Sequence, residues 1–128
     1  MKIPVLKLIA LMALFGLVAC GDSQKQAENA IKALADNYAK NPLPRGWKLL
    51  SITPDVQSFK LNVDVLVTSD KDINSLKMLS RMEQFSVAKL GCPLMHAGLQ
   101  QAIGSSTRIW VHLRANNKEL TASICPIE

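Results

Sequence analysis

The sequence lacks most features that mark an enzyme or a nucleic-acid-binding protein. Its 128 residues carry a formal net charge of +5 but contain no run of Lys or Arg, so we expect no nucleic-acid partner. Gly91, Gly98 and Gly104 are too scattered to form a phosphate-binding loop, and no paired carboxylates or Ser/His/Asp set stand in a recognisable context. We therefore predict a protein that is not an enzyme, with no catalytic residue, no cofactor and no metal site.

The sequence also lacks an apolar run long enough to cross a membrane. Lys2 and Lys7 are followed by an apolar segment from Leu8 to Ala19, which is shorter than the roughly 20 residues that a bilayer-spanning helix needs. The apolar segment ends at Cys20, and the chain turns polar at once. This pattern of charged start, short apolar stretch and small residues predicts a targeting peptide over residues 1–19.

The stretch Leu17-Val18-Ala19-Cys20 resembles the lipobox of bacterial prolipoproteins. The resemblance implies cleavage before Cys20 and attachment of diacylglycerol to its sulfur, and thus a lipid-anchored protein of the cell envelope that faces the periplasm. Because Gly21 rather than an aspartate follows the cysteine, the resemblance favours the outer membrane over the inner membrane. A plain secretory peptide that is cleaved near Ala19 and leaves Cys20 unlipidated is the alternative.

With Cys20 assigned to lipid, two of the three cysteines remain, Cys92 and Cys125. Since the periplasm is oxidising, we predict a disulfide between them. Of the 15 Lys and Arg residues, Lys2 and Lys7 leave with the signal peptide, so the mature chain carries 13 against 10 Asp and Glu. Such a mildly basic chain has the length of one domain. We expect a lipidated N-terminus and short linker over 20–26 and one domain over 27–128.

Three segments have the spacing of helices. The first covers 24–40 and ends before Asn41-Pro42-Leu43-Pro44, because proline disfavours helical backbone in the preceding residue. The second covers 73–90, after capping residues at 69–72, and Gly91 is expected to end it. The third begins at Cys92-Pro93 and ends at Ile103-Gly104.

Four segments read as strands, at 47–53, 58–68, 107–115 and 119–125. Pro54-Asp55 is expected to form the first hairpin turn, and Asn116-Asn117 the second. Alternation assigns one set of side chains to the core: Phe59, Leu61, Val63, Val65, Val67, Ile109, Val111, Leu113, Leu120, Ala122 and Ile124. The simplest fold is an α+β domain with a four-stranded antiparallel sheet of two hairpins and helices packed on one face.

The candidate binding surface is a row of polar side chains on the strand at 107–115. Alternation places Arg108, Trp110, His112 and Arg114 on one face of the sheet, opposite the core. An indole between guanidinium groups can stack with them and dock a partner protein, an anionic lipid headgroup or a cell-wall carboxylate. A solvated face held together by cation–π contacts, or a face covered by the first helix, is the alternative reading.

Two other groups of residues permit more than one reading. Cys92 and His96 are four residues apart, as a thiolate and its base or a metal pair would be, but a disulfide cysteine beside an ordinary histidine is the favoured interpretation. Met78, Met82 and Met95 are read as flexible core filler rather than as ligands of a soft metal.

The sequence as a whole predicts a small lipoprotein that docks to, or helps to assemble, an envelope complex of the secretion, conjugation or cell-wall type. The membrane is the expected first partner, through the lipid on Cys20, and an envelope protein complex is the second. The alternative function is a periplasmic module that binds a small ligand or inhibits another protein, which requires a concave pocket.

Overall fold

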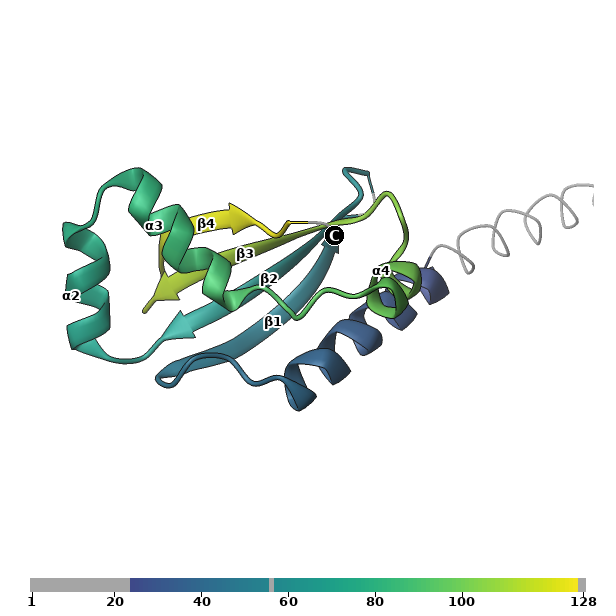
Figure 1. The fold of residues 1–128 in the computed structure, drawn as a ribbon, viewed down its shortest axis with the longest axis horizontal. Coiled ribbons are helices and arrows are strands. Elements are labelled where there is room, and N and C mark those ends of the chain that lie inside the picture. Colours follow the sequence, from purple (N-terminus) through teal and green to yellow (C-terminus); the bar gives the residue numbers. More distant parts are fainter. Residues whose placement is uncertain (1–23, 56, 127–128) are drawn as a thin grey trace, which may run out of the picture.

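The structure, a computed structural model, describes residues 24–55 and 57–126. Figure 1 shows a sheet with helices on one of its faces. An N-terminal helix covers 24–40. The other elements, in chain order, are β1 (Trp47–Asp55), β2 (Lys60–Val67), α2 (Asp70–Met78), α3 (Arg81–Ala88), a 3-10 turn (Lys89–Gly91), α4 (Ala97–Ile103), β3 (Arg108–Ala115) and β4 (Lys118–Ile124). The expected α+β class is confirmed.

The sheet is mixed, which corrects the antiparallel prediction. The strand order is β1-β2-β3-β4, and both expected hairpins, β1–β2 and β3–β4, are present. However, β2 and β3 run parallel, with Leu61 beside Ile109 and Val65 beside Leu113. Parallel strands require a long crossover, and residues 68–107 supply it.

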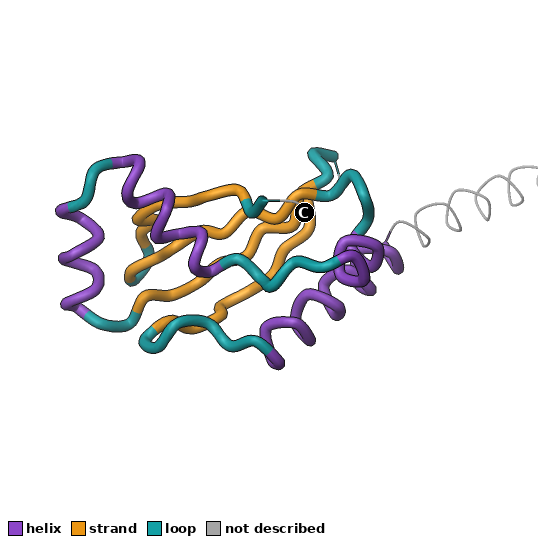
Figure 2. Tube along the Cα trace, viewed as in Figure 1, coloured by secondary structure: helices purple, strands orange, loops and turns teal. Residues whose placement is uncertain are grey.

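The path of the crossover explains the parallel pair. In Figure 1, α2 lies beyond the end of β2, and α3 then runs back across the sheet towards α4, near the end where β2 begins. The chain therefore enters β3 at the same end as β2. In Figure 2 α3 crosses the strands, α2 lies beyond their left end, and the N-terminal helix lies at the lower right, beyond β1. This return path covers the apolar side of β2 and β3 with helices, which a short hairpin connection between them could not do.

The core lies between this helical layer and the sheet. Val63, Val65, Val111 and Leu113 are fully buried on the sheet side, and Leu34 of the N-terminal helix is fully buried against them. The helices therefore cover one face, as expected, and the N-terminal helix packs on the core side rather than on the polar side.

Tyr38 joins the N-terminal helix to the crossover. Its hydroxyl donates a hydrogen bond of 2.7 Å to the carbonyl oxygen of Gly91, and burial raises the pKa of Tyr38 well above its ordinary value of 10.0. Gly91 is itself buried, and a methyl group there would lie 2.8 Å from Cγ1 of Val111. The chain needs glycine at this point because no room remains between the crossover and β3.

The single helix predicted over 73–90 is wrong, because the chain forms two helices with a break at Leu79 and Ser80. Ser80 caps α3: its hydroxyl accepts from the backbone N–H of Glu83, and the Glu83 side chain accepts from the backbone N–H of Ser80. This reciprocal capping box supports a new helix start. At the other end, Ser69 caps α2 as expected, and its hydroxyl accepts from the N–H of Asp72.

The third helix begins later than predicted, at Ala97 rather than at Cys92-Pro93. Residues 93–96 are non-helical, and His96 is the N-cap, with its Nδ1 accepting from the N–H of Leu99 at 3.1 Å. A side-chain acceptor at this position satisfies one of the free N–H groups of the first turn, as a Ser or Asp cap would.

The first hairpin turn also differs from the prediction. β1 continues through Pro54 and Asp55, which pair with Leu61 and Lys60. Proline is tolerated there because β1 is an edge strand. Phe59, expected in the core, lies in the turn with φ +51° and is 61 % exposed.

Most of the last strand presents the opposite side chains to the core from those predicted. Of Leu120, Ala122 and Ile124, only Leu120 packs against the core, and it is half-buried. Thr121, Ser123 and Cys125 are buried, whereas Ile124 is exposed. Thr121 lies opposite Leu113, and the register shifts between Leu113 and Arg114. The expected disulfide between Cys92 and Cys125 is present, with 5.6 Å between the two Cα atoms. Because Cys92 belongs to the crossover, Cys125 must face the helices, and alternation then turns Thr121 and Ser123 inward as well.

Candidate functional site

The candidate site is the face of the sheet that the described helices leave uncovered. We call it the open face and define it by the outward side chains of the two central strands. They are half-buried by one another and lie in register across the parallel pair. The set comprises Lys60, Asn62, Asp64 and Leu66 on β2, and Arg108, Trp110, His112 and Arg114 on β3.

One end of the open face is an ion pair with a hydroxyl attached. The Nε of Arg114 donates to Oδ1 of Asp64 at 2.9 Å, and the hydroxyl of Ser51 on β1 donates to Oδ2 at 3.1 Å. Burial by itself would raise the pKa of Asp64, but the hydrogen bonds from Arg114 and Ser51, together with the positive charge of Arg114, outweigh it and lower the pKa below 3.8. Arg114 is thus bound within the protein.

The middle of the open face is a second polar cluster, centred on His112. Its Nδ1 lies 2.5 Å from Oε1 of Glu119 on β4, and its Nε2 lies 2.9 Å from Oδ1 of Asn62 on β2. Both ring nitrogens are therefore engaged, and the imidazole bridges three strands. His112 holds β2, β3 and β4 in register here and has no nitrogen left for a ligand.

The other end of the open face contains two cations that no carboxylate of the described residues contacts. The Nζ of Lys60 lies 5.1 Å from the centre of the Trp110 ring, within cation–π range. Within the described residues, neither Lys60 nor Arg108 forms an ion pair, and Nη1 of Arg108 is buried there without a hydrogen-bond partner. Trp110 also lies beside the exposed Ile124 of β4. We call Lys60, Arg108, Trp110 and Ile124 the Trp110 end.

The predicted row of four side chains is thus on one face, as expected, but its members do different things. Arg114 and His112 are bound to carboxylates of neighbouring strands, whereas Arg108 and Trp110 are not. Sequence reasoning missed Lys60 as the cation over the indole. The alternation of β2 placed Lys60 on the polar face, but only the pairing of β2 with β3 brings it to Trp110.

The second candidate, Cys92 with His96, does not form a reactive pair. Cys92 is held in the disulfide, and His96 caps α4 through Nδ1. Over residues 24–55 and 57–126, no group of three or more His, Cys, Asp or Glu side chains could hold a metal ion. Met95 is half-buried against the core, but Met78 is 88 % exposed and Met82 is 74 % exposed, so their assignment as core filler is wrong.

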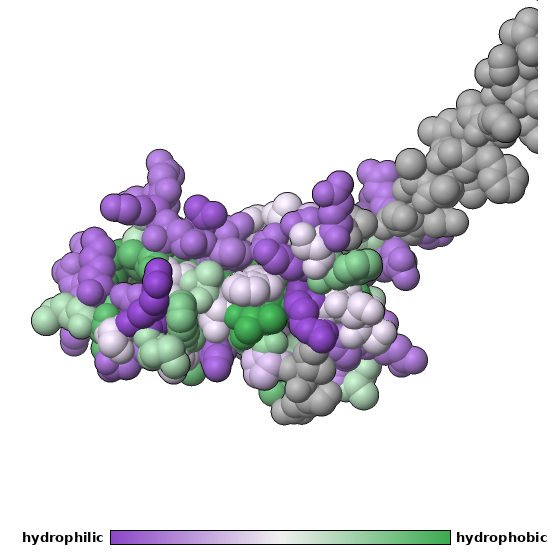
Figure 3. All heavy atoms as spheres, turned by 90° about the horizontal axis from the view of Figure 1, so that it is seen from above, coloured by the Kyte–Doolittle hydropathy of each residue, from purple (hydrophilic) through white to green (hydrophobic). Residues whose placement is uncertain are grey.

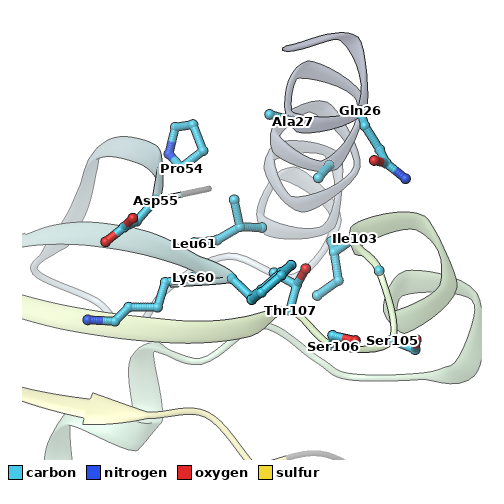
Figure 4. Close-up of a pocket in the computed structure, with 13 residues that line it drawn as sticks. Gln26, Ala27, Pro54, Asp55, Lys60, Leu61, Ile103, Ser105, Ser106 and Thr107 are labelled. Atoms are coloured by element: carbon cyan, nitrogen blue, oxygen red, sulfur yellow. The ribbon is translucent and has the colours of Figure 1, made fainter. Parts of the chain in front are cut away.

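A cleft of about 400 Å³ lies at the end of the molecule where the N-terminal helix begins (Figure 4). Its walls come from that helix, from the β1–β2 hairpin and from the connection between α4 and β3. Apolar side chains, Ala27, Leu61 and Ile103 among them, alternate with the polar groups of Gln26 and residues 105–107. A volume of this size suits a small ligand.

The predicted lipid site at Cys20, and the whole of the signal peptide, lie outside the described residues. No helix within the described ranges combines the length and hydrophobicity that a membrane crossing requires. Comparisons with known protein families, with curated proteins and with solved structures found no match.

Proposed function

We propose that this protein is a lipid-anchored envelope lipoprotein, without enzymatic activity, whose open face docks onto another envelope protein. The anchor rests on the resemblance of residues 17–20 to a lipobox. The docking role rests on one observation: at the Trp110 end, an indole and two cations lie on an uncovered sheet face and have no carboxylate partner among the described residues.

The chemistry of this end suits a protein interface. Trp and Arg are enriched among the residues that dominate binding energy, because they combine a large apolar area with directed donors. Arg108 has no carboxylate partner among the described residues, and the guanidinium fork of an arginine suits a carboxylate of a partner protein. Arg114 and His112, in contrast, are already satisfied, so we assign them to the integrity of the face rather than to the partner.

The experiment is photocrosslinking in cells with a photoreactive residue at position 53. Thr53 is exposed on β1, and it lies in the same row as Asn62 and Trp110. A discrete protein adduct at position 53 is expected, and the same probe at Asn74, exposed on α2, should not give it. R108E should reduce the adduct about tenfold or more, as for an interface hot spot.

The matched control is K118E, which changes the net charge equally at an exposed β4 position. K118E should give the same amount of adduct as the wild-type protein. A C20A variant should lose the adduct, because the protein is then no longer anchored. An adduct that survives both R108E and W110A would refute docking through the Trp110 end.

A second function, capture of a small ligand, is favoured by the cleft alone. A27W, at a half-buried position that lines the cleft, would fill its mouth. If A27W abolishes the cellular role while the crosslink at position 53 persists, the cleft rather than the open face carries the function.

A further inference from the structure

The exposed apolar side chains of this protein are concentrated in one segment. Of the eight large hydrophobic residues that the described part of the chain exposes, five lie between residues 78 and 94, on or beside α3. We call these five the α3 stripe: Met78, Met82, Phe85, Leu90 and Leu94. Scattered exposed apolar residues are ordinary, whereas a concentration of them marks an interaction surface.

Helical geometry places the centre of the α3 stripe on the side of α3 that faces away from the core. Met82 and Phe85 are three residues apart and are neighbours on the helix surface, with Lys89 one turn further on. The side of α3 away from Met82 is used for packing: Ala88, which neighbours Phe85, is fully buried, and Gln84 donates to the carbonyl oxygen of Leu76. Met82 therefore lies on the outer surface of the helical layer, and Phe85, 36 % exposed, lies at its border with the packed side.

The charges around the α3 stripe are mainly positive and unpaired. Lys77, Arg81 and Lys89 are exposed, and none of them forms an ion pair with a described residue. The nearby acid, Glu83, is occupied in the capping box with Ser80. Apolar side chains flanked by Lys and Arg are the composition that binds the interface of an anionic bilayer.

The length of the tether brings the domain to such a bilayer. Only four residue steps separate Cys20 from Gln24, the first described residue of the N-terminal helix. Even fully extended, they span about 14 Å at 3.3–3.6 Å per residue. A protein anchored at Cys20 therefore keeps the end of its domain where the N-terminal helix begins within reach of the lipid headgroups, and the helical layer extends from that end towards α2 (Figure 1).

We infer that the α3 stripe rests on the surface of an anionic membrane and orients the domain. The inference rests on the lipid anchor of the proposed function. In Figure 3 hydrophilic surface lies along most of the upper edge, and separate hydrophobic patches lie below it among hydrophilic side chains. Because the helices and the open face are on opposite sides of the sheet, a domain that lies on its helical layer presents Trp110 away from the bilayer, towards a partner.

The test is depth-dependent fluorescence quenching of the mature lipidated protein in vesicles. F85W places an indole in the α3 stripe, and T53W places one on the open face as the matched control. In vesicles of phosphatidylcholine with about one third phosphatidylglycerol and brominated acyl chains, the added emission of F85W should be quenched and that of T53W should not. The triple variant K77Q/R81Q/K89Q should lose most of this quenching, since each cation near an anionic surface changes partition about fivefold.

The control for charge is K32Q/K40Q/K118Q, which removes three other exposed cations and should leave the quenching of F85W unchanged. Equal quenching at positions 85 and 53, or none at 85, would overturn the inference. A lipid-independent dimer that M82S/F85S dissolves would also overturn it, because a second copy of the chain would then cover the stripe.

These failures are distinct from failure of the proposed function. The mass of the mature protein reports directly whether Cys20 carries lipid, and the crosslink at position 53 reports docking. An acylated protein that crosslinks normally but shows no quenching of F85W would disprove only the membrane contact.

Discussion

The two faces of the sheet are built from alternate residues of the same strands, yet different forces hold them. On β3, Ile109, Val111 and Leu113 are buried under helices. They stabilise the folded state because their apolar surface is removed from water. Their neighbours His112 and Arg114 contact carboxylates at the half-exposed open face. Apolar burial does not depend on the ionisation of side chains, whereas surface ion pairs contribute little and are screened by salt. The covered face therefore supplies most of the folding stability, and the open face contributes little to it.

The last strand, β4, does not follow this separation of an apolar covered face from a polar open face. The core side of β4 carries Thr121 and Ser123, and Ile124 points to the open face. The disulfide at Cys125 has overridden the preference for apolar side chains inside. Polar atoms in the core and an exposed Ile at the Trp110 end are the consequences.

The largest expected effect comes from removal of the disulfide that joins the helical layer to β4. The double variant C92A/C125A should lose about 2 to 5 kcal/mol of unfolding free energy, since the cross-link restricts the unfolded chain. Urea unfolding of the variant and of the disulfide-bonded wild-type protein measures this loss, and the reduced wild-type protein should show a similar one. A loss of unfolding free energy below about 1 kcal/mol would mean that apolar burial, without the disulfide, keeps the helical layer on the sheet.

The next effect tests the close contact between the crossover and β3. G91A should cost roughly 1 to 3 kcal/mol, because its methyl group would meet Cγ1 of Val111 at 2.8 Å in a packed interior. The same substitution at the exposed Gly98 is the control, and it should cost less, since the nearest atoms belong to the end of the His96 side chain. Equal unfolding midpoints for the two variants would contradict this account.

A smaller effect, of opposite sign, is expected on the core side of β4. The hydroxyl of Thr121 is buried and has no hydrogen-bond partner among the described residues. T121V keeps the shape and removes the unsatisfied group, so it should raise the unfolding free energy by about 1 kcal/mol. T68V is the matched control and should be destabilising, because the Thr68 hydroxyl donates to the carbonyl oxygen of Gly46 at 2.7 Å. A destabilised T121V would show that its hydroxyl is satisfied in solution.

The smallest effect belongs to the open face. R114A should cost about 0.2 to 1 kcal/mol at neutral pH and low salt, as a partly exposed ion pair does, while K118A, which removes an unpaired cation, should cost less. The folded protein lowers the pKa of Asp64, so the stabilising contribution of the Asp64 carboxylate is complete above the ordinary pKa of 3.8. This contribution is lost as the pH falls through the lower pKa of the folded protein. The difference in unfolding free energy between wild type and D64N should therefore become smaller in acid, and a difference that stays constant down to pH about 2 would contradict the ion pair.

Local patterns predicted much of the fold because they act over a few residues. The period of two in β2 and β3 identified the buried and open faces, and the period of 3.6 with Asn41-Pro42 located the N-terminal helix and its end. The break between α2 and α3 also has a local signal, Ser80 followed by Glu83, which the long helical pattern concealed. The grouping of Arg108, Trp110, His112 and Arg114 on one face was correct for the same reason.

By itself, the sequence thus determined the four strands, the N-terminal helix, the pairing of the strands into two hairpins, which side of β3 is polar and which cysteines could pair. The tertiary structure alone decided that β2 and β3 run parallel and that β4 turns Thr121 inward. It also decided that Arg114 and His112 contact carboxylates, while Lys60 and Arg108 contact none among the described residues. The physical reason is the distance along the sequence between the groups that interact. Alternation and capping depend on neighbours along the chain, whereas strand direction, register and ion pairing depend on groups up to 50 residues apart that only the folded chain brings together.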